Sequence, residues 1–200
     1  MHYASSLTLA LVLQAFPAAA GAPTDQLKQR VDEVIRVLED PGMKDRPAQR
    51  HAAVRKIAEN IFDYPDTARR ALGPHWTART PEEQREFVAM FADLLDRAYL
   101  SRVDLYQGEK VRYTGEAVDG DQASVTTVLV TPKGTTIPVE YRMHQANDQW
   151  RVYDVVIEGV SLVANYRTQF NRIVQTESYG ALVQKIRDRQ AEPAASPSSR

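Results

Sequence analysis

The 200-residue chain contains no cysteine, which excludes disulfide bridges, thiol catalysis and thiolate metal sites. It also lacks an excess of charge of either sign: the formal net charge is −1, so the composition predicts no basic surface for nucleic acid. The nine glycines are scattered over turns and helix ends and form no phosphate-binding loop. At this length a packed core can stabilise the fold without covalent crosslinks.

The first 24 residues contain no Asp, Glu, Lys or Arg. Within them, residues 7–16 (LTLALVLQAF) are apolar, and the small residues 18–22 (AAAGA) follow at a spacing that suits a signal peptidase. The apolar run is much shorter than the roughly 20 residues that a membrane-spanning helix needs. We therefore interpret residues 1–22 as a signal peptide and expect an exported protein.

Apolar residues recur at helical spacing in the first half of the remaining chain. A first helix carries Leu27, Val31 and Leu38 on one face, and a second helix follows Pro47. A short helix is expected between residue 65 and the Gly-Pro pair at 73–74. The longest helix then begins with a capping-box sequence, in which Thr80 is the N-cap and Glu83 its partner.

Near residue 108 the apolar period changes from helical to alternating, which predicts antiparallel strands joined by tight turns. The four expected strands cover residues 110–118, 123–131, 136–144 and 149–158. Helices over 161–177 and 179–189 follow. The sequence thus predicts one α+β domain over residues 23–190, with helices packed on a four-stranded or slightly larger sheet, and a disordered Pro/Ser/Ala tail over 191–200.

Motifs that would carry catalytic or metal chemistry are scarce. The four histidines fall at no spacing that presents two ligands to one metal, so no metal site is predicted. The sequence around Ser161 (GVSLV) lacks the second glycine of a nucleophile elbow. We therefore interpret Ser161 as the N-cap of the helix that follows.

Asp154 is the strongest catalytic candidate, because it interrupts an apolar strand. Strict alternation places it on one face with Trp150, Val152 and Val156. A carboxylate in an apolar cavity can act as a general base, with His144 or Tyr141 of the preceding strand assisting. The alternative is structural: Asp154 faces solvent, or accepts hydrogen bonds from a helix N-terminus or from an arginine such as Arg167.

Two long stretches resemble the MlaC family, the toluene-tolerance or ABC-transporter auxiliary family of Gram-negative bacteria. The first comprises residues 61–64 (IFDY), 71–73 (ALG), 75–76 (HW), 80–87 (TPEEQREF) and 91–95 (FADLL). The second is residues 152–170 (VYDVVIEGVSLVANYRTQF), which is similar to the most recognisable motif of that family. The matched segments follow one another in the family's order over nearly all of the exported part.

The resemblance implies a periplasmic phospholipid carrier whose curved sheet and helices enclose an apolar pocket. Members carry glycerophospholipids between an outer-membrane complex of MlaA with a porin and the MlaD ring of an inner-membrane ABC transporter, and so maintain outer-membrane lipid asymmetry. The resemblance implies no cofactor, no ATP site and no enzyme activity.

A lipid needs a carrier because exposing its acyl chains to water costs free energy. Two acyl chains contain about 30 methylenes, and exposing them to water costs on the order of 20 kcal/mol at ~0.8 kcal/mol each. The interior must therefore be about as apolar as a membrane. The expected lipid-binding residues are Phe87, Phe91, Leu94, Leu95 and Tyr99 of the long helix, Val128, Val130, Val139 and Tyr141 of the sheet, and Val155, Ile157, Leu162, Val163 and Tyr166 of the motif.

Arg167 is the expected headgroup contact, because a guanidinium binds phosphate bidentately. A structural pair of Arg167 with Asp154 or Glu158 is the alternative. Two other functions remain open from the residues alone: an adaptor module with a solid core and no ligand, and a small pocket enzyme that uses Asp154 as its base.

Overall fold

The computed structural model describes residues 22–99 and 104–191. The expected signal peptide and tail lie outside the described residues, apart from their inner ends at residues 22 and 191. Where the chain is described, no helix is long and apolar enough to cross a membrane.

The order of elements confirms the α+β prediction. The structure has α1 (Pro23–Glu39), α2 (Pro47–Ile61), α3 (Tyr64–Leu72) and α4 (Pro81–Tyr99), then β1 (Lys110–Asp119), β2 (Gln122–Val130), β3 (Thr136–Ala146), β4 (Gln149–Ile157) and β5 (Val160–Ser161), and finally α5 (Leu162–Thr176) and α6 (Tyr179–Ala191). Two short 3₁₀ turns, η1 (Pro41–Met43) and η2 (Gly73–His75), follow α1 and α3.

Local capping sequences set where the helices begin. At α4 the capping box forms as expected: the backbone N–H of Thr80 donates to Glu83 Oε2 at 2.8 Å, and the N–H of Glu83 donates to Thr80 Oγ1 at 3.2 Å. At α5 the hydroxyl of Ser161 accepts from the N–H of Ala164 at 3.0 Å, which confirms Ser161 as an N-cap.

The strands form one antiparallel sheet in the order β1-β2-β3-β4-β5. The turns fall where the sequence placed them, with left-handed φ at Gly120 and at the pair Asn147 and Asp148. β5 is the strand beyond the predicted four. It has two residues, too few to show an alternating pattern.

A β-bulge in β4 changes which residues share a face of the sheet. Met143 pairs with Val152 but Arg142 pairs with Asp154, so Tyr153 is the extra residue. Val152 consequently faces α1 and α2, together with Trp150, while Asp154 lies on the opposite face with Arg142. The prediction that Asp154 shares a face with Trp150 and Val152 is therefore wrong, because it assumed strict alternation.

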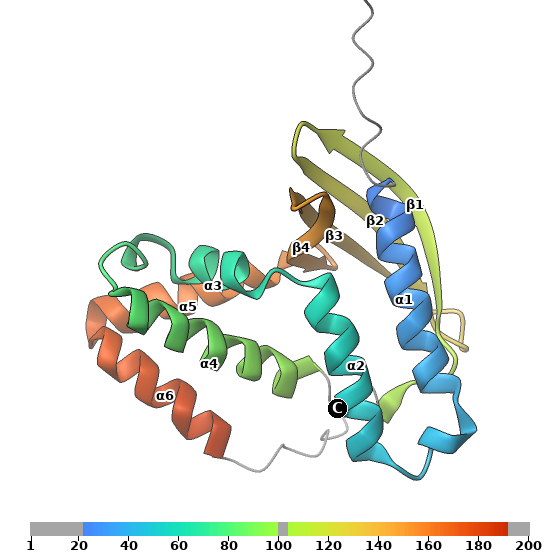
Figure 1. The fold of residues 1–200 in the computed structure, drawn as a ribbon, viewed down its shortest axis with the longest axis horizontal. Coiled ribbons are helices and arrows are strands. Elements are labelled where there is room, and N and C mark those ends of the chain that lie inside the picture. Colours follow the sequence, from blue (N-terminus) through green and yellow to red (C-terminus); the bar gives the residue numbers. More distant parts are fainter. Residues whose placement is uncertain (1–21, 100–103, 192–200) are drawn as a thin grey trace, which may run out of the picture.

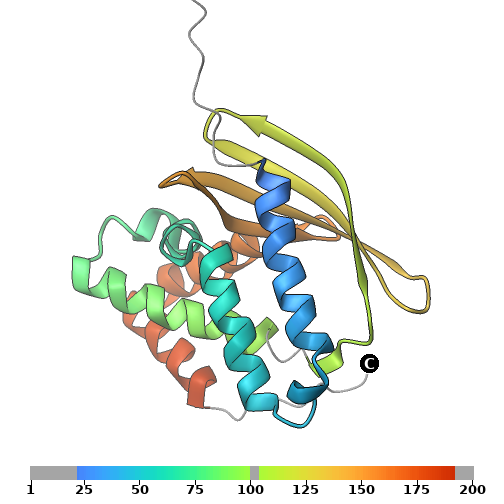
Figure 2. The same ribbon diagram turned by 45° about the vertical axis from the view of Figure 1, so that its right-hand side comes forward.

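Two hydrophobic cores result. One lies between the inner face of the sheet and the helices α1 and α2, and its buried residues include Leu27, Ile61, Val125 and Val152. The other lies among α3, α4, α5 and α6. Figure 1 shows these four helices on the left and the sheet with α1 on the right, and Figure 2 shows α1 lying along the sheet. The link between α2 and α3 joins the cores, where Phe62 forms a parallel bridge with Val152.

Candidate functional site

A small apolar cavity lies where the two cores meet. Its walls come from the α2–α3 link, α3, α4, β4 and α5. Six of the expected lipid-binding residues line it: Phe91, Leu95, Val155, Leu162, Val163 and Tyr166. The cavity volume is about 30 Å³, which is room for two or three water molecules at roughly 10–15 Å³ each.

Aromatic rings make the wall of the cavity on the helical side. The rings of Phe91 and Tyr166 meet edge to face with their centroids 5.1 Å apart, and Phe91 meets Phe170 in the same way at 5.4 Å. Phe87 stacks behind Phe91 at 5.9 Å and is 0% exposed. Phe87 therefore belongs to the helical core, one layer behind the cavity.

Other expected lining residues point elsewhere. Leu94 lines a second small cavity between α4, α5 and α6, of about 50 Å³, together with Phe170 and Leu182. Tyr99 is the last described residue of α4. Tyr99 lines neither of these two cavities, but it lies close enough to Tyr166 to help raise the pKa of that phenol, after the larger effect of burial.

The expected sheet residues divide between the two faces. Val139 and Tyr141 pair with Ile157 and Val155, so these four share the inner face of the sheet. On β2, the residues that pair with Tyr141 and Val139 are Val125 and Thr127. Val125 and Thr127 therefore also lie on the inner face. Val128 and Val130 consequently lie on the outer face.

Asp154 is held at the start of α5. It is 5% exposed. The Ser161 hydroxyl donates to its Oδ2 at 2.6 Å, and the backbone N–H of Val163 donates to its Oδ1 at 3.0 Å. Arg142 Nη1 lies 3.4 Å from Oδ2. Both carboxylate oxygens are thus engaged, as the structural interpretation expected, and they complement the positive end of the helix.

The assisting groups expected beside Asp154 lie away from it. His144 Nε2 contacts Asp63 Oδ2 at 2.9 Å, at the N-cap of α3. Tyr141 lies on the inner face, opposite to Asp154. The structure therefore places no acid–base pair at Asp154 from the residues named for that role.

Arg167 ties α5 to α3. Its Nε donates to the carbonyl oxygen of Arg70 at 2.8 Å. Its methylenes pass beside Gly73, where a Cβ would lie 3.4 Å from both Cγ and Cδ of Arg167. The arginine that pairs with Asp154 is Arg142 and not Arg167.

One buried polar group was not predicted from the sequence, and it directly follows the cavity residue Leu95 in the chain. Asp96 of α4 is 8% exposed. Arg55 Nε of α2 lies 2.9 Å from Asp96 Oδ2, and the hydroxyl of Tyr64 donates to Oδ1 at 3.3 Å. Burial raises the pKa of Asp96, and Asp93 and Glu59 add to this effect, while Arg55 and Tyr64 lower it. Asp96 lies far from both Arg55 and Tyr64 in the sequence, so no local pattern reveals that the three residues form a cluster.

Fold and cavity together define a class: α+β proteins in which an open antiparallel sheet and a layer of helices meet at an apolar cavity. A family model described as "MlaC protein" matches residues 28–188. The chain belongs to the MlaC family, which confirms the resemblance seen in the sequence.

Individual relatives agree with this assignment. The toluene tolerance protein ttg2D of Pseudomonas putida is 24% identical over 174 residues, which are 84% of this chain and 81% of that protein. The intermembrane phospholipid transport system binding protein MlaC of Haemophilus influenzae is 21% identical over 129 residues, 62% of this chain and 60% of its own.

A solved structure extends the comparison to three dimensions. The phospholipid-binding protein of Ralstonia solanacearum, whose structure contains a phospholipid, is 26% identical and superposes with a TM-score of 0.78. The match covers 86% of this chain and 98% of that one. The fold described above is therefore the fold of a protein that holds a phospholipid.

Proposed function

We propose that this chain is a periplasmic phospholipid carrier. The observation that carries the proposal is the apolar cavity between the two cores, in a fold that the phospholipid-bound relative shares over 98% of its length. The relatives named for toluene tolerance and for intermembrane phospholipid transport support the same role.

The tails of the lipid would enter between the two cores. Even a drug-sized ligand occupies a pocket of about 300–1,000 Å³, much more than the cavity beside Phe91. Uptake therefore requires the walls of this cavity to move apart. Phe91, Leu95, Val155, Leu162, Val163 and Tyr166 would be the first side chains to meet the tails. Val139, Tyr141 and Ile157 continue the apolar surface along the inner face of the sheet.

The carrier would exchange lipid with two membrane systems. Its proposed partners are the MlaA–porin complex of the outer membrane and the MlaD ring of the inner-membrane ABC transporter, and the exchange maintains outer-membrane lipid asymmetry. Export by the signal peptide of residues 1–22 would bring the chain to the periplasm. No catalytic step is part of this proposal, since the bonds of Asp154 make it a helix cap.

Transfer of a fluorescent phospholipid between two vesicle populations tests the proposal. A carrier raises the transfer rate in proportion to its concentration, because it ferries single lipids through water. An adaptor with a solid core leaves the rate at the level of vesicles alone, and that result would contradict the proposal.

A further inference from the structure

We propose that Arg55 is a phosphate contact of the bound phospholipid, and that the phosphate replaces Asp96 as the partner of its guanidinium. The inference rests on the proposed carrier function and names a headgroup residue for it. Its basis is the polar cluster of Arg55, Asp96 and Tyr64, which we call the rim cluster.

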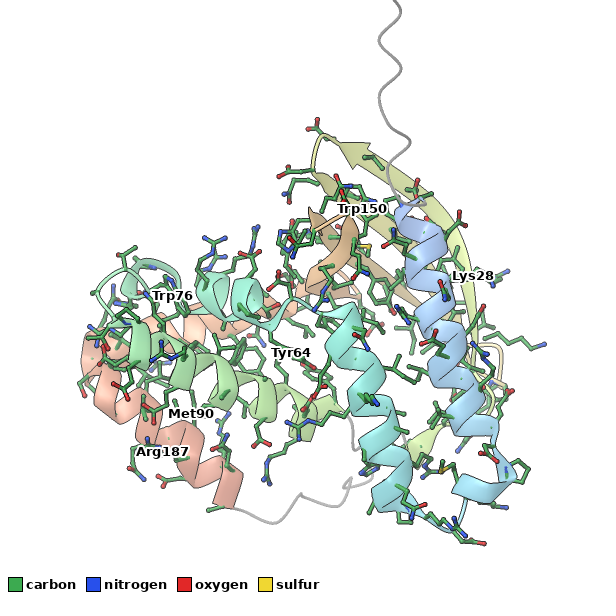
Figure 3. The ribbon with its side chains drawn as sticks, viewed as in Figure 1. Lys28, Tyr64, Trp76, Met90, Trp150 and Arg187 are labelled. Carbon is green, nitrogen blue, oxygen red and sulfur yellow. The ribbon has the colours of Figure 1, made fainter. Side chains whose placement is uncertain are left out.

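The rim cluster is connected to the lining of the apolar cavity through two neighbouring residues. Leu95 and Phe62 line the cavity. Asp96 follows Leu95 in the chain, and the rings of Phe62 and Tyr64 are 6.0 Å apart. Figure 3 shows Tyr64 in the space between α2 and α4. A lipid with its tails in the cavity has its phosphate at the edge of the apolar region. The rim cluster provides polar groups next to the apolar residues Leu95 and Phe62, so we place the phosphate there.

The two charged members differ in their access to solvent. The side chain of Arg55 is 46% exposed, whereas that of Asp96 is almost entirely buried. A guanidinium has five N–H donors and can bind a phosphate with two of them at once. Arg55 can therefore meet a headgroup from the solvent side before its Nε leaves Asp96.

Asp96 is a weak competitor for this arginine. Burial raises the pKa of Asp96 even though Arg55 lies beside it, so the attraction does not fully offset the cost of removing the carboxylate from water. When a phosphate takes Arg55, Asp96 keeps the hydrogen bond with Tyr64 and can take up a proton from solvent. A lipid phosphate stays ionised near neutral pH.

Replacement of Asp96 by the phosphate at Arg55 would also break a contact between the two cores. α4 packs mainly against α3 and α6, which belong to the helical core. The ion pair with Arg55 connects α4 to α2, which covers the sheet. Arrival of the phosphate at Arg55 would thus loosen α4 from α2 as the tails enter between the cores.

The test compares Arg55→Gln with Asp96→Asn, because both substitutions break the same ion pair. The measurement is uptake of fluorescent phosphatidylglycerol from phosphatidylethanolamine–phosphatidylglycerol vesicles, beside uptake of fluorescent diacylglycerol, which has similar tails and no phosphate. We expect Arg55→Gln to reduce phosphatidylglycerol occupancy roughly tenfold, the scale of one lost charged hydrogen bond, and to leave diacylglycerol occupancy unchanged. Asp96→Asn keeps phosphatidylglycerol occupancy at or above the wild-type level.

Arg187→Gln and Glu86→Gln are the matched controls, because they break an exposed ion pair between α6 and α4 within the helical core. Neither should alter uptake. An equal loss in Arg55→Gln and Asp96→Asn, an equal loss for both lipids, or no loss in Arg55→Gln would overturn the proposal. A wild-type chain that takes up neither lipid would instead contradict the carrier function, and the role of Arg55 with it.

Discussion

The hydroxyl of Ser161 donates to Asp154 Oδ2 at 2.6 Å and, in the same position, accepts the backbone N–H of Ala164. Ser161 thus joins the carboxylate of β4 to the first turn of α5. This bond explains why a charged residue sits in an apolar strand: Asp154 is the anchor on the sheet for a helix that lines the cavity.

Replacing Asp154 tests this role against a catalytic one. We expect Asp154→Asn to lower the free energy of unfolding by about 1–3 kcal/mol, because the buried donors of Ser161 and Val163 lose a charged acceptor. Ser161→Ala should cost less, about 1 kcal/mol. Urea denaturation of both variants measures the loss. An Asp154→Asn protein of unchanged stability would contradict the anchoring role.

The neighbours Leu94 and Leu95 offer a matched test of the cavity. Leu95 lines the cavity between the cores, while Leu94 faces α6. Leu95→Trp should reduce lipid occupancy several-fold, because the indole fills space that the tails need. Leu94→Trp should mainly destabilise the helical core, by about 1–3 kcal/mol through overpacking.

Lipid extraction from equal amounts of folded protein gives the occupancies, and thermal unfolding gives the stabilities. If the two variants carried the same reduced amount of lipid and were equally stable, the assignment of Leu95 to the cavity and of Leu94 to the helical core would be wrong.

Asp96 makes stability depend on pH with a defined sign. Its pKa is raised in the folded state, so the folded protein holds this proton more tightly than the unfolded chain does. The contribution is therefore fully present below the ordinary pKa of 3.8 and is lost as the pH rises through the raised value. The groups that face Asp96 are Arg55, Glu59, Tyr64 and Asp93.

Asp96→Asn removes this dependence. Relative to the wild type, the variant should gain stability as the pH rises from about 3.8 through the raised pKa of Asp96. Above that range the difference should be constant. Unfolding curves of both proteins from pH 3.8 to neutral give the difference. If the variant instead lost stability relative to the wild type as the pH rose, the pKa of Asp96 would be lowered and not raised.

The capping box of α4 gives a prediction independent of the lipid. Thr80→Ala removes the acceptor of the Glu83 N–H, and we expect a loss of about 0.5–2 kcal/mol. Lipid occupancy of the folded fraction should not change, because Thr80 lies at the end of α4 far from Leu95. A change in occupancy without a change in stability would be the contrary result.

Local signals made much of the fold predictable. The capping residues Thr80, Glu83 and Ser161, the turn at Gly120 and the periods of helices and strands each act within a few residues, so a single sequence shows them. Among the expected lining residues, those of the 152–170 motif were the best placed, since four of the five, Val155, Leu162, Val163 and Tyr166, line the cavity.

Long-range geometry was not predictable in the same way. β2 is apolar on both faces, so alternation could not tell that Val125 and Thr127 face inward while Val128 and Val130 face outward. The bulge at Tyr153 reversed the face of Asp154 without any sequence signal. Arg55 and Asp96 are 41 positions apart in the chain, and only folding brings them together.

Native mass spectrometry of the exported protein, purified from the periplasm without detergent and followed by lipid extraction, is the most direct test of the carrier function. We predict a stoichiometric adduct with the mass of a phospholipid, which is released as intact lipid on denaturation. A protein that shows only its own mass, and that stays free of lipid after incubation with phospholipid vesicles, would contradict the carrier function.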